Sequence, residues 1–248
     1  VYFIAFSIFR KLLDAFSFTF CLLRKSIFRM VLQQTYWRIY RRLFRYRATS
    51  NRSFNLFRIY HFMEVYVIRH TKVEVPKGIC YGQTDVALAA TFEEEMKELK
   101  RKLPENFDLV FSSPLTRCKQ FALQFSDEIT YDNRLKEMYF GEWEMKAWSD
   151  IPLEEIQPWY DDFVFTETPN GDSFESLYLR CASFLEELRQ QKATKILLVT
   201  HGGIIRSIWA YLLDIPLQNA FKVPVDFGEV FHFNLGKTPQ EDIIIQKK

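Results

Sequence analysis

The chain has 248 residues and a net charge of +2, but residues 1–62 carry 12 Lys and Arg against one acid, whereas residues 63–248 carry the other 21 against 30 acids. All 8 Gly and all 9 Pro lie in the second part, so the turn residues of a folded domain are found there and not in the first. The second part is long enough for one single-core domain and too short for two comfortable ones.

Several classes of site are excluded by their missing motifs. The four cysteines, at positions 21, 80, 118 and 181, have no paired spacing, which argues against a disulfide framework or a CxxC zinc site and favours the cytoplasm. None of the four histidines has a second ligand at helical spacing, so no metal site is predicted. The chain also lacks a Walker loop, a GxGxxG turn and the Cys-x5-Arg motif of cysteine phosphatases.

Residues 1–62 contain apolar runs that charged residues interrupt, and neither Val1–Phe9 nor Leu12–Leu23 reaches the roughly 18 uncharged residues of a membrane-spanning helix. One interpretation is a basic amphipathic helix around 32–45 that lies on an anionic membrane. The other is a non-native extension, because the composition changes abruptly at Met63. We favour the second interpretation, so membrane contact is expected only if the extension is native.

Three short apolar runs after Met63 are continuous rather than alternating, as expected for strands buried on both faces of a parallel sheet. They are Val65–Ile68, Leu109–Phe111 and Ile196–Val199. Helix-like segments lie at 91–103, 115–125, 173–191 and 203–213. Because strands and helices alternate, the sequence predicts an α/β domain over 63–248.

The segment 173–191 is the longest of the predicted helices. Its apolar residues form one stripe, and Asp172 or Ser173 can cap its start. Val230–Phe233 and Ile243–Ile245 are predicted to be further strands, nearer the edge of the sheet.

Polar residues follow each of the three continuous runs. Arg69 and His70 follow the first run, Arg117 lies shortly after the second, and His201 and Gly202 follow the third. Ligands of open α/β sheets bind outside the carboxyl ends of the strands, so these residues are expected to converge. Guanidinium groups bind anion oxygens in pairs, and imidazoles change protonation near neutral pH. The pattern predicts a phosphate site.

Several spaced segments occur in the order found in the histidine phosphatase superfamily, the phosphoglycerate mutase-like enzymes, which this chain resembles. They are 69–71 (RHT), 112–117 (SSPLTR), 135–144 (LKEMYFGEWE), 171–174 (GDSF) and 199–203 (VTHGG). The resemblance covers essentially all of residues 63–235. It implies a three-layer α/β sandwich with a mainly parallel central sheet, the phosphoglycerate mutase-like fold.

Residues 76–88 (PKGICYGQTDVAL), together with Thr71 where most members have Gly, most resemble the α-ribazole phosphatase branch. That branch removes a phosphate during assembly of the cobalamin lower nucleotide loop. The resemblance therefore implies a phosphomonoesterase acting on α-ribazole 5′-phosphate or cobamide 5′-phosphate. Its partner would be this small-molecule substrate, with no cofactor, metal or nucleic acid; the oligomeric state is left open.

The resemblance also implies a role for each matched residue. His70 would be the nucleophile that forms a phosphohistidine. Arg69, Arg117 and His201 would hold the equatorial phosphoryl oxygens. Glu137 would protonate the leaving alkoxide and then activate water.

Three further residues complete the predicted site. The backbone amide of Gly202 would add a donor to the phosphate, and Tyr81 and Gln83 would line the substrate pocket. The choice of acid rests on the motif register alone, because Glu142 and Glu144 lie nearby.

Two positions depart from the family pattern. Val73 stands where many members have a small hydroxyl residue, which removes one phosphate hydrogen bond and weakens the mutase and general-phosphatase assignments. Asp172 stands where the family often has Glu.

Two other functions remain as alternatives. A broad sugar-phosphate phosphatase or a phosphoglycerate mutase would share the same chemistry on the same fold, although the insertion typical of mutases is not seen between Phe125 and Glu137. A non-enzymatic phosphate-binding or membrane-associated protein would account for the basic first 62 residues. The intact set of histidines, arginines and glutamate argues against it.

Overall fold

A six-stranded sheet forms the centre of residues 62–247, the part of the chain that this computed structural model describes. Its strands are β1 Met63–Arg69, β2 Leu109–Ser112, β3 Thr130–Tyr131, β4 Lys195–Thr200, β5 Val230–Leu235 and β6 Ile243–Lys247. The helices are α2 Phe92–Lys100, α3 Thr116–Ala122, α4 Leu153–Asp161, α5 Phe174–Leu188 and α6 Gly202–Leu213. Short 3-10 helices lie at Asn133–Leu135, Gly141–Trp143, Trp148–Asp150, Leu217–Lys222 and Pro239–Glu241.

The sheet is mainly parallel, which confirms the predicted fold class. Its order is β3-β2-β4-β1-β5-β6. Strands β1 to β4 run parallel, and β5 is antiparallel to both of its neighbours, β1 and β6. The carboxyl ends of the adjacent strands β2, β4 and β1 therefore meet at one edge, where the predicted site residues follow them.

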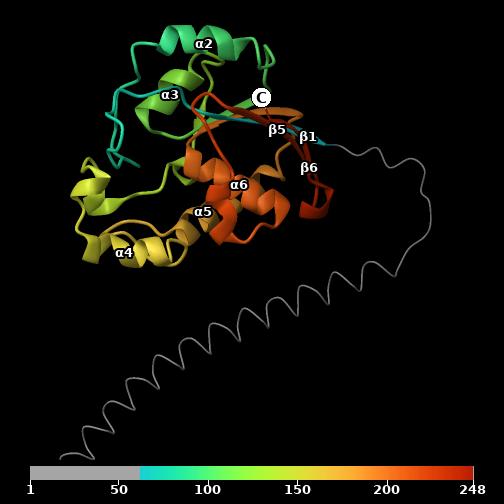
Figure 1. The fold of residues 1–248 in the computed structure, drawn as a ribbon. Coiled ribbons are helices and arrows are strands. Elements are labelled where there is room, and N and C mark those ends of the chain that lie inside the picture. Colours follow the sequence, from blue (N-terminus) through green and yellow to red (C-terminus); the bar gives the residue numbers. More distant parts are fainter. Residues whose placement is uncertain (1–61, 248) are drawn as a thin grey trace, which may run out of the picture. The chain divides into compact units, whose positions relative to one another are not determined.

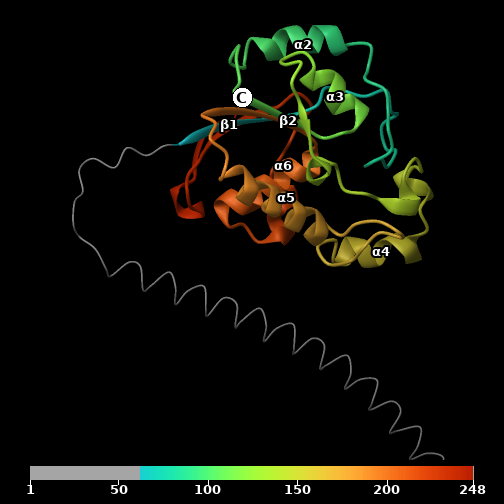
Figure 2. The same cartoon turned by 180° about the vertical axis from the view of Figure 1, so that it is seen from behind.

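Helices cover both faces of this sheet. Helices α2 and α3 lie on one side and α5 and α6 on the other (Figures 1 and 2). Within β4, Leu197 and Val199 pack in the cluster that includes α2 and α3, whereas Ile196 and Leu198 pack with α5 and α6. Alternate residues of β4 point to opposite faces of the sheet, and both faces are buried, which is why the strand is a continuous apolar run.

The predicted helices are present with shorter ends. Helix α2 ends at Lys100 rather than at residue 103, and α5 ends at Leu188 rather than at residue 191. Of the two candidate caps of α5, Ser173 is the one used, since its hydroxyl accepts a hydrogen bond from the Ser176 amide at 3.2 Å.

Two elements were not predicted, β3 and α4. Strand β3 is a two-residue, exposed pair beside β2. Helix α4 contains Pro158 and starts after Pro152, whose side chain cannot cap it. Its Ile156 joins a small separate core with Cys80 and Trp143.

Residues 1–61, on which the two interpretations of the N-terminal extension depend, lie outside the described residues. No helix within residues 62–247 is both long enough and apolar enough to span a bilayer.

Candidate active site

His70 lies directly after β1, and its side chain is almost completely buried, with 2% of its surface exposed. Its Nδ1 lies 2.7 Å from the carbonyl oxygen of Thr71, to which only a protonated nitrogen can donate. Its Nε2 accepts a hydrogen bond from Nε of Arg117 at 3.2 Å. The two contacts together select the tautomer in which Nε2 carries the lone pair.

The surroundings keep this imidazole neutral. The pKa of His70 is well below its ordinary value, first because the ring is buried and then because Arg117 and Arg69 carry positive charge nearby. A neutral imidazole with its lone pair on Nε2 is the form that can attack phosphorus.

His201 occupies the N-cap position of α6, without a capping hydrogen bond from its side chain, and lies beside His70. The centroids of the two rings are 5.1 Å apart and the rings are inclined by 66°. Nε2 of His201 is 2.8 Å from the hydroxyl of Ser113, which follows β2. The pKa of His201 is also well below its ordinary value, chiefly through burial and then through Arg117 and His70.

Arg117 lies in the first turn of α3 and is fully buried. Besides His70, its guanidinium donates hydrogen bonds to the carbonyl oxygens of Gly82 and Thr84, the latter at 3.0 Å. The same loop holds the start of α3 in return, because Asp85 accepts a hydrogen bond from the Thr116 amide at 2.9 Å. Arg117 is thereby held against Nε2 of His70.

Arg69, the last residue of β1, is held from the opposite side. Its Nη1 donates to the carbonyl oxygen of Val225 at 2.7 Å, and its guanidinium carbon lies 3.8 Å from the centroid of the Phe227 ring. Its buried Nε has no hydrogen-bond partner among the described residues. That N–H is a donor that a bound anion can satisfy.

The Glu137 carboxylate lies against the start of α6. The Gly203 amide donates to both of its oxygens at 3.1 Å, and the Met138 amide donates to Oε1 at 2.9 Å. A carboxylate is stabilised at a helix N-terminus by the partial positive charge of the first amides. The structure therefore brings Glu137 to the start of the helix that begins beside His201.

The loop that carries Glu137 is held by Arg180 of α5. The Arg180 guanidinium donates to the carbonyl oxygens of Arg134 at 2.8 Å, Lys136 at 2.5 Å and Glu137 at 2.8 Å. It also lies 3.5 Å from a carboxylate oxygen of Asp172. Sequence reasoning missed this residue.

The three remaining predicted residues lie around these groups. Gly202 is the first residue of α6, and a β-carbon there would lie 3.5 Å from the guanidinium carbon of Arg69. The Tyr81 ring lies under Arg117, with the guanidinium carbon 5.6 Å from the ring centroid. The side-chain amide of Gln83 donates to the Glu137 carbonyl oxygen at 3.1 Å and so contacts the loop that carries Glu137.

Glu144, one of the competing acids, has a different task. Its carboxylate accepts hydrogen bonds from the amides of Gln83 at 2.8 Å, Thr84 at 2.5 Å and Phe140 at 3.1 Å. It joins two loops beside the site. Glu142, the other competitor, accepts a hydrogen bond from the side chain of Asn170 at 2.5 Å.

Arg206 is a further cation that the sequence analysis missed. A β-carbon at Gly202 would lie 3.0 Å from Nη1 of Arg206, next to the guanidinium of Arg69. The sequence did contain a signal, because Arg206 lies four residues after Gly202 and so on the same face of α6.

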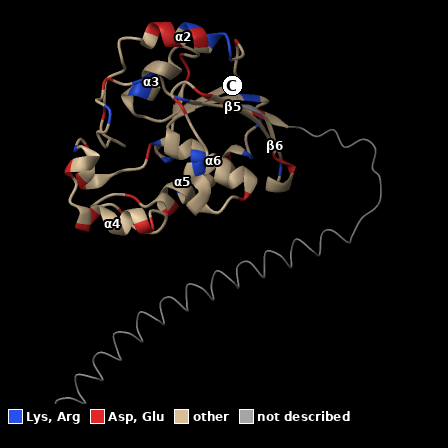
Figure 3. Ribbon diagram, in the orientation of Figure 1, with Lys and Arg blue, Asp and Glu red and all other residues tan. Residues whose placement is uncertain are grey.

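Charge is distributed unevenly over the domain. Acidic residues occur on α4 and in the first turn of α2, whose last turn is basic, and basic residues occur on α3 and α6 (Figure 3). The single basic residue of α6 is Arg206. The positive charges at the site are thus a local feature of an otherwise acidic domain.

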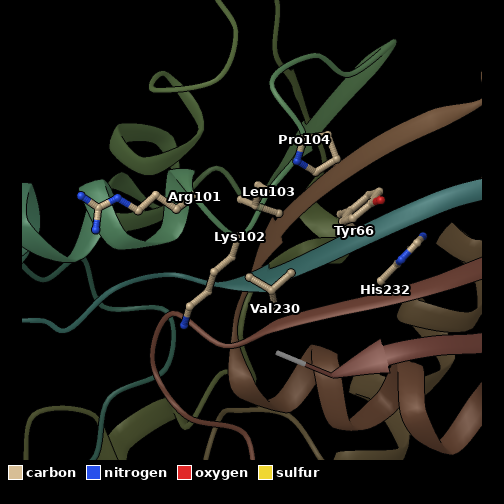
Figure 4. Close-up of a pocket in the computed structure, with 7 residues that line it drawn as sticks. All are labelled: Tyr66, Arg101, Lys102, Leu103, Pro104, Val230 and His232. Carbon is tan, nitrogen blue, oxygen red and sulfur yellow. The ribbon is translucent and has the colours of Figure 1, made fainter.

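A cavity elsewhere in the domain contains none of the predicted site residues. It has a volume of about 270 Å³ and lies between β1, β5 and the segment that follows α2 (Figure 4). Tyr66 and His232 lie side by side in its wall, with ring centroids 4.1 Å apart. Arg101 is directed away from them in this view and forms a 2.7 Å ion pair with Glu98.

Within residues 62–247, no three His, Cys, Asp or Glu side chains are grouped in a way that could hold a metal ion. The potential phosphate ligands described above are instead arginines, imidazoles and backbone amides.

Comparison with known proteins matches residues 65–240 to the model of the histidine phosphatase superfamily, branch 1. A Hydrogenobacter thermophilus protein, provisionally named phosphoserine phosphatase 2, is 32% identical over 171 residues, which are 65% of this chain and 84% of the relative. The adenosylcobalamin/alpha-ribazole phosphatase of Escherichia coli (strain K12) is 30% identical over 176 residues, 67% of this chain and 87% of that protein.

Solved structures agree with these matches. The crystal structure of the alpha-ribazole phosphatase from Shigella flexneri has a TM-score of 0.67 and 26% sequence identity, and the match covers 74% of this chain and 95% of that one. The resemblance predicted from the sequence is confirmed.

Proposed function

The chain belongs to the histidine phosphatase superfamily, and we propose that it hydrolyses small phosphomonoesters through a phosphohistidine formed on His70. The observation that carries this proposal is the pair of hydrogen bonds made by the His70 ring. Nδ1 donates to Thr71, and Nε2, with its lone pair, faces Arg117. The nucleophilic atom and a cation for the transferred group are thereby placed together.

In the first step Nε2 of His70 attacks phosphorus, and the bond from phosphorus to the ester oxygen breaks. Arg117, Arg69 and His201 stabilise the negative charge on the equatorial oxygens. Glu137 gives its proton to the departing alkoxide. Oε2 is the oxygen suited to carry that proton, since the Met138 amide donates only to Oε1.

In the second step a water molecule attacks the phosphohistidine. The Glu137 carboxylate takes the proton from that water as the oxygen–phosphorus bond forms and the nitrogen–phosphorus bond breaks. Inorganic phosphate leaves, and His70 returns to its neutral form. Arg69 and Arg117 are the cationic side chains that serve both steps.

The first candidate substrate is α-ribazole 5′-phosphate or its cobamide-attached form. Support comes from residues 76–88, which resemble that branch, and from the 30% identity to the Escherichia coli adenosylcobalamin/alpha-ribazole phosphatase. In the structure this segment supplies Gly82 and Thr84, which hold Arg117, so it lies at the site where it can contact a leaving group.

The second candidate is a small phosphorylated acid such as phosphoserine. The 32% identity to the Hydrogenobacter thermophilus relative supports it. Arg206 also supports it, because it adds a positive charge beside Arg69. An uncharged nucleoside leaving group would not need this additional charge.

An activity assay on the full chain tests this proposal. α-Ribazole 5′-phosphate, phosphoserine, 3-phosphoglycerate and p-nitrophenyl phosphate are offered with and without EDTA. We expect phosphate release that EDTA leaves unchanged and an acid-labile phosphoenzyme after quenching. His70→Ala should abolish both. Loss of activity in EDTA, or a normal phosphoenzyme in His70→Ala, would contradict the mechanism.

A further inference from the structure

We propose that Arg206 forms a second anion subsite, which binds a carboxylate on the leaving group and so determines specificity for phosphorylated acids. This inference rests on the proposed function and extends it to the substrate class. It depends on three features of the described residues: where the Arg206 guanidinium lies, what it contacts, and which charges surround it.

The position of Arg206 places it next to the phosphate site. Its Nη1 and the guanidinium of Arg69 both lie against Gly202, at 3.0 and 3.5 Å from where a β-carbon would be. The neighbouring residue Gly203 donates to the Glu137 carboxylate. The first turn of α6 therefore contacts Arg69 and Arg206 at Gly202 and the Glu137 carboxylate at Gly203.

The contacts of Arg206 leave its hydrogen-bonding capacity unused. Its guanidinium carbon lies 5.1 Å from the centroid of the Phe221 ring, as Arg69 lies over Phe227. Its Nε is buried without a hydrogen-bond partner, and it forms no ion pair with a side chain in the described part of the chain. Buried donors are normally satisfied, so an unpaired guanidinium at a site points to an anionic ligand.

The surrounding charges indicate which part of the substrate this ligand is. Burial lowers the pKa of Arg206, and the charge of Arg69 lowers it further, whereas the carboxylates of Glu137, Glu229 and Asp226 raise it. Arg206 lies against Gly202, and Glu137, the proposed acid for the leaving group, lies against the next residue, Gly203. A substrate carboxylate close to the ester oxygen would therefore pair with Arg206.

A matched pair of substrates tests this assignment. O-phosphoserine and O-phosphoethanolamine share the phosphate, the ester carbon and the ammonium group, and they differ only in the carboxylate. We expect the wild-type chain to prefer phosphoserine in kcat/KM. Arg206→Met should lower kcat/KM for phosphoserine by about tenfold to a hundredfold, the value of a lost charge-assisted hydrogen bond. Phosphoethanolamine has no carboxylate to pair with Arg206, so it should lose clearly less, and the preference for phosphoserine should fall about tenfold.

Two further variants serve as controls. Arg206→Lys keeps the positive charge but not the planar guanidinium group. Its kcat/KM for phosphoserine should lie between the values of wild type and Arg206→Met. Arg101→Met removes the same charge from an exposed position on the α2 side and should leave the preference unchanged. Retained hydrolysis of phosphoethanolamine by Arg206→Met also shows that this variant is folded.

The outcomes separate the subsite from the mechanism. An equal loss on both substrates would mean that Arg206 binds the phosphoryl group itself, and an absent wild-type preference would mean that it binds no carboxylate. Either result overturns the subsite. If the wild-type chain releases phosphate from p-nitrophenyl phosphate in either case, the proposed function stands. Absence of any phosphatase activity or phosphoenzyme would instead refute the function.

Discussion

Two arginines would both prepare His70 as the proposed nucleophile and bind the phosphoryl group. Burial, and then the charges of Arg117 and Arg69, lower the pKa of His70. Arg117 donates to Nε2 of His70, and Nε of Arg69 is a buried donor without a hydrogen-bond partner among the described residues. A positive charge that repels a proton attracts a phosphoryl oxygen. Pairing these arginines with carboxylates would weaken both effects, and in the described part of the chain neither forms an ion pair.

Gly203 provides a test of the acid that does not alter its chemistry. A β-carbon at this position would lie 2.2 Å from Oε1 of Glu137 and 2.9 Å from a methyl carbon of Leu177. Gly203→Ala should therefore displace the carboxylate. We expect kcat for an alkyl phosphate to fall about tenfold to a hundredfold, and kcat for p-nitrophenyl phosphate to fall much less, because its leaving group scarcely needs a proton. Steady-state kinetics on both substrates measures the difference.

The Glu137→Gln background supplies the control for this variant. If Gly203→Ala acts through the acid, adding it to Glu137→Gln should cause little further loss. Fully additive losses would show that the alanine disturbs something else, such as the amide of Gly202.

The sequence predicted the residues near strand ends and missed two arginines further along helices. Arg69, His70 and His201 were found because each lies within two residues of the end of an apolar run, and the ends of parallel strands meet. Arg180 and Arg206 lie within helices, where a basic residue is usually on a solvated face. Their directions depend on how α5 and α6 are rotated against the sheet, which the sequence pattern alone does not determine.

At the scale of elements, the Glu137 loop depends on α5. Residues 134–137 contain only one short 3-10 helix, and three of their carbonyl oxygens are bound by the single guanidinium of Arg180. Asp172 completes the arrangement, because it lies 3.5 Å from Arg180 and accepts a hydrogen bond from the Tyr139 amide at 3.0 Å. These contacts predict that Arg180 positions Glu137, the proposed acid.

Arg180→Lys should therefore affect proton transfer more than substrate binding. Lysine keeps the charge but cannot donate in the fixed directions of a planar fork. We expect kcat for alkyl phosphates to fall about tenfold with KM nearly unchanged, and the loss to shrink for p-nitrophenyl phosphate. Equal losses on both leaving groups would indicate general destabilisation and would contradict the positioning role. Arg101→Met on the surface is the matched control.

The elements that the sequence failed to predict have weak local signals. The central strands were predicted because both of their faces are buried, which gives them continuous apolar runs in the sequence. Strand β3 has two exposed residues and owes its existence to pairing with β2, whereas α4 tolerates Pro158 because its apolar residues pack on Trp143 and Cys80. Such tertiary contacts override local propensity.

For the whole molecule, burying two neutral imidazoles among cations makes stability depend on pH. The folded pKa values of His70 and His201 both lie well below 6.5, the ordinary value that applies in the unfolded chain. Above about pH 7.5 neither state binds these protons, and there is no contribution. As the pH falls below 6.5, the unfolded chain binds protons that the folded domain excludes, so stability decreases.

The expected loss between pH 7.5 and 5.5 is about 1.4 kcal/mol of unfolding free energy for each histidine, provided that both stay neutral in the folded domain. Urea unfolding of the full chain at three pH values measures it. His70→Asn and His201→Asn each remove one titrating group, so each variant should lose about 1.4 kcal/mol less than wild type over this range. The remaining histidines and carboxylates titrate alike in all three proteins and cancel. If the three pH dependences coincide, the imidazoles are charged in the folded domain, and His70 could not serve as a neutral nucleophile below pH 6.5.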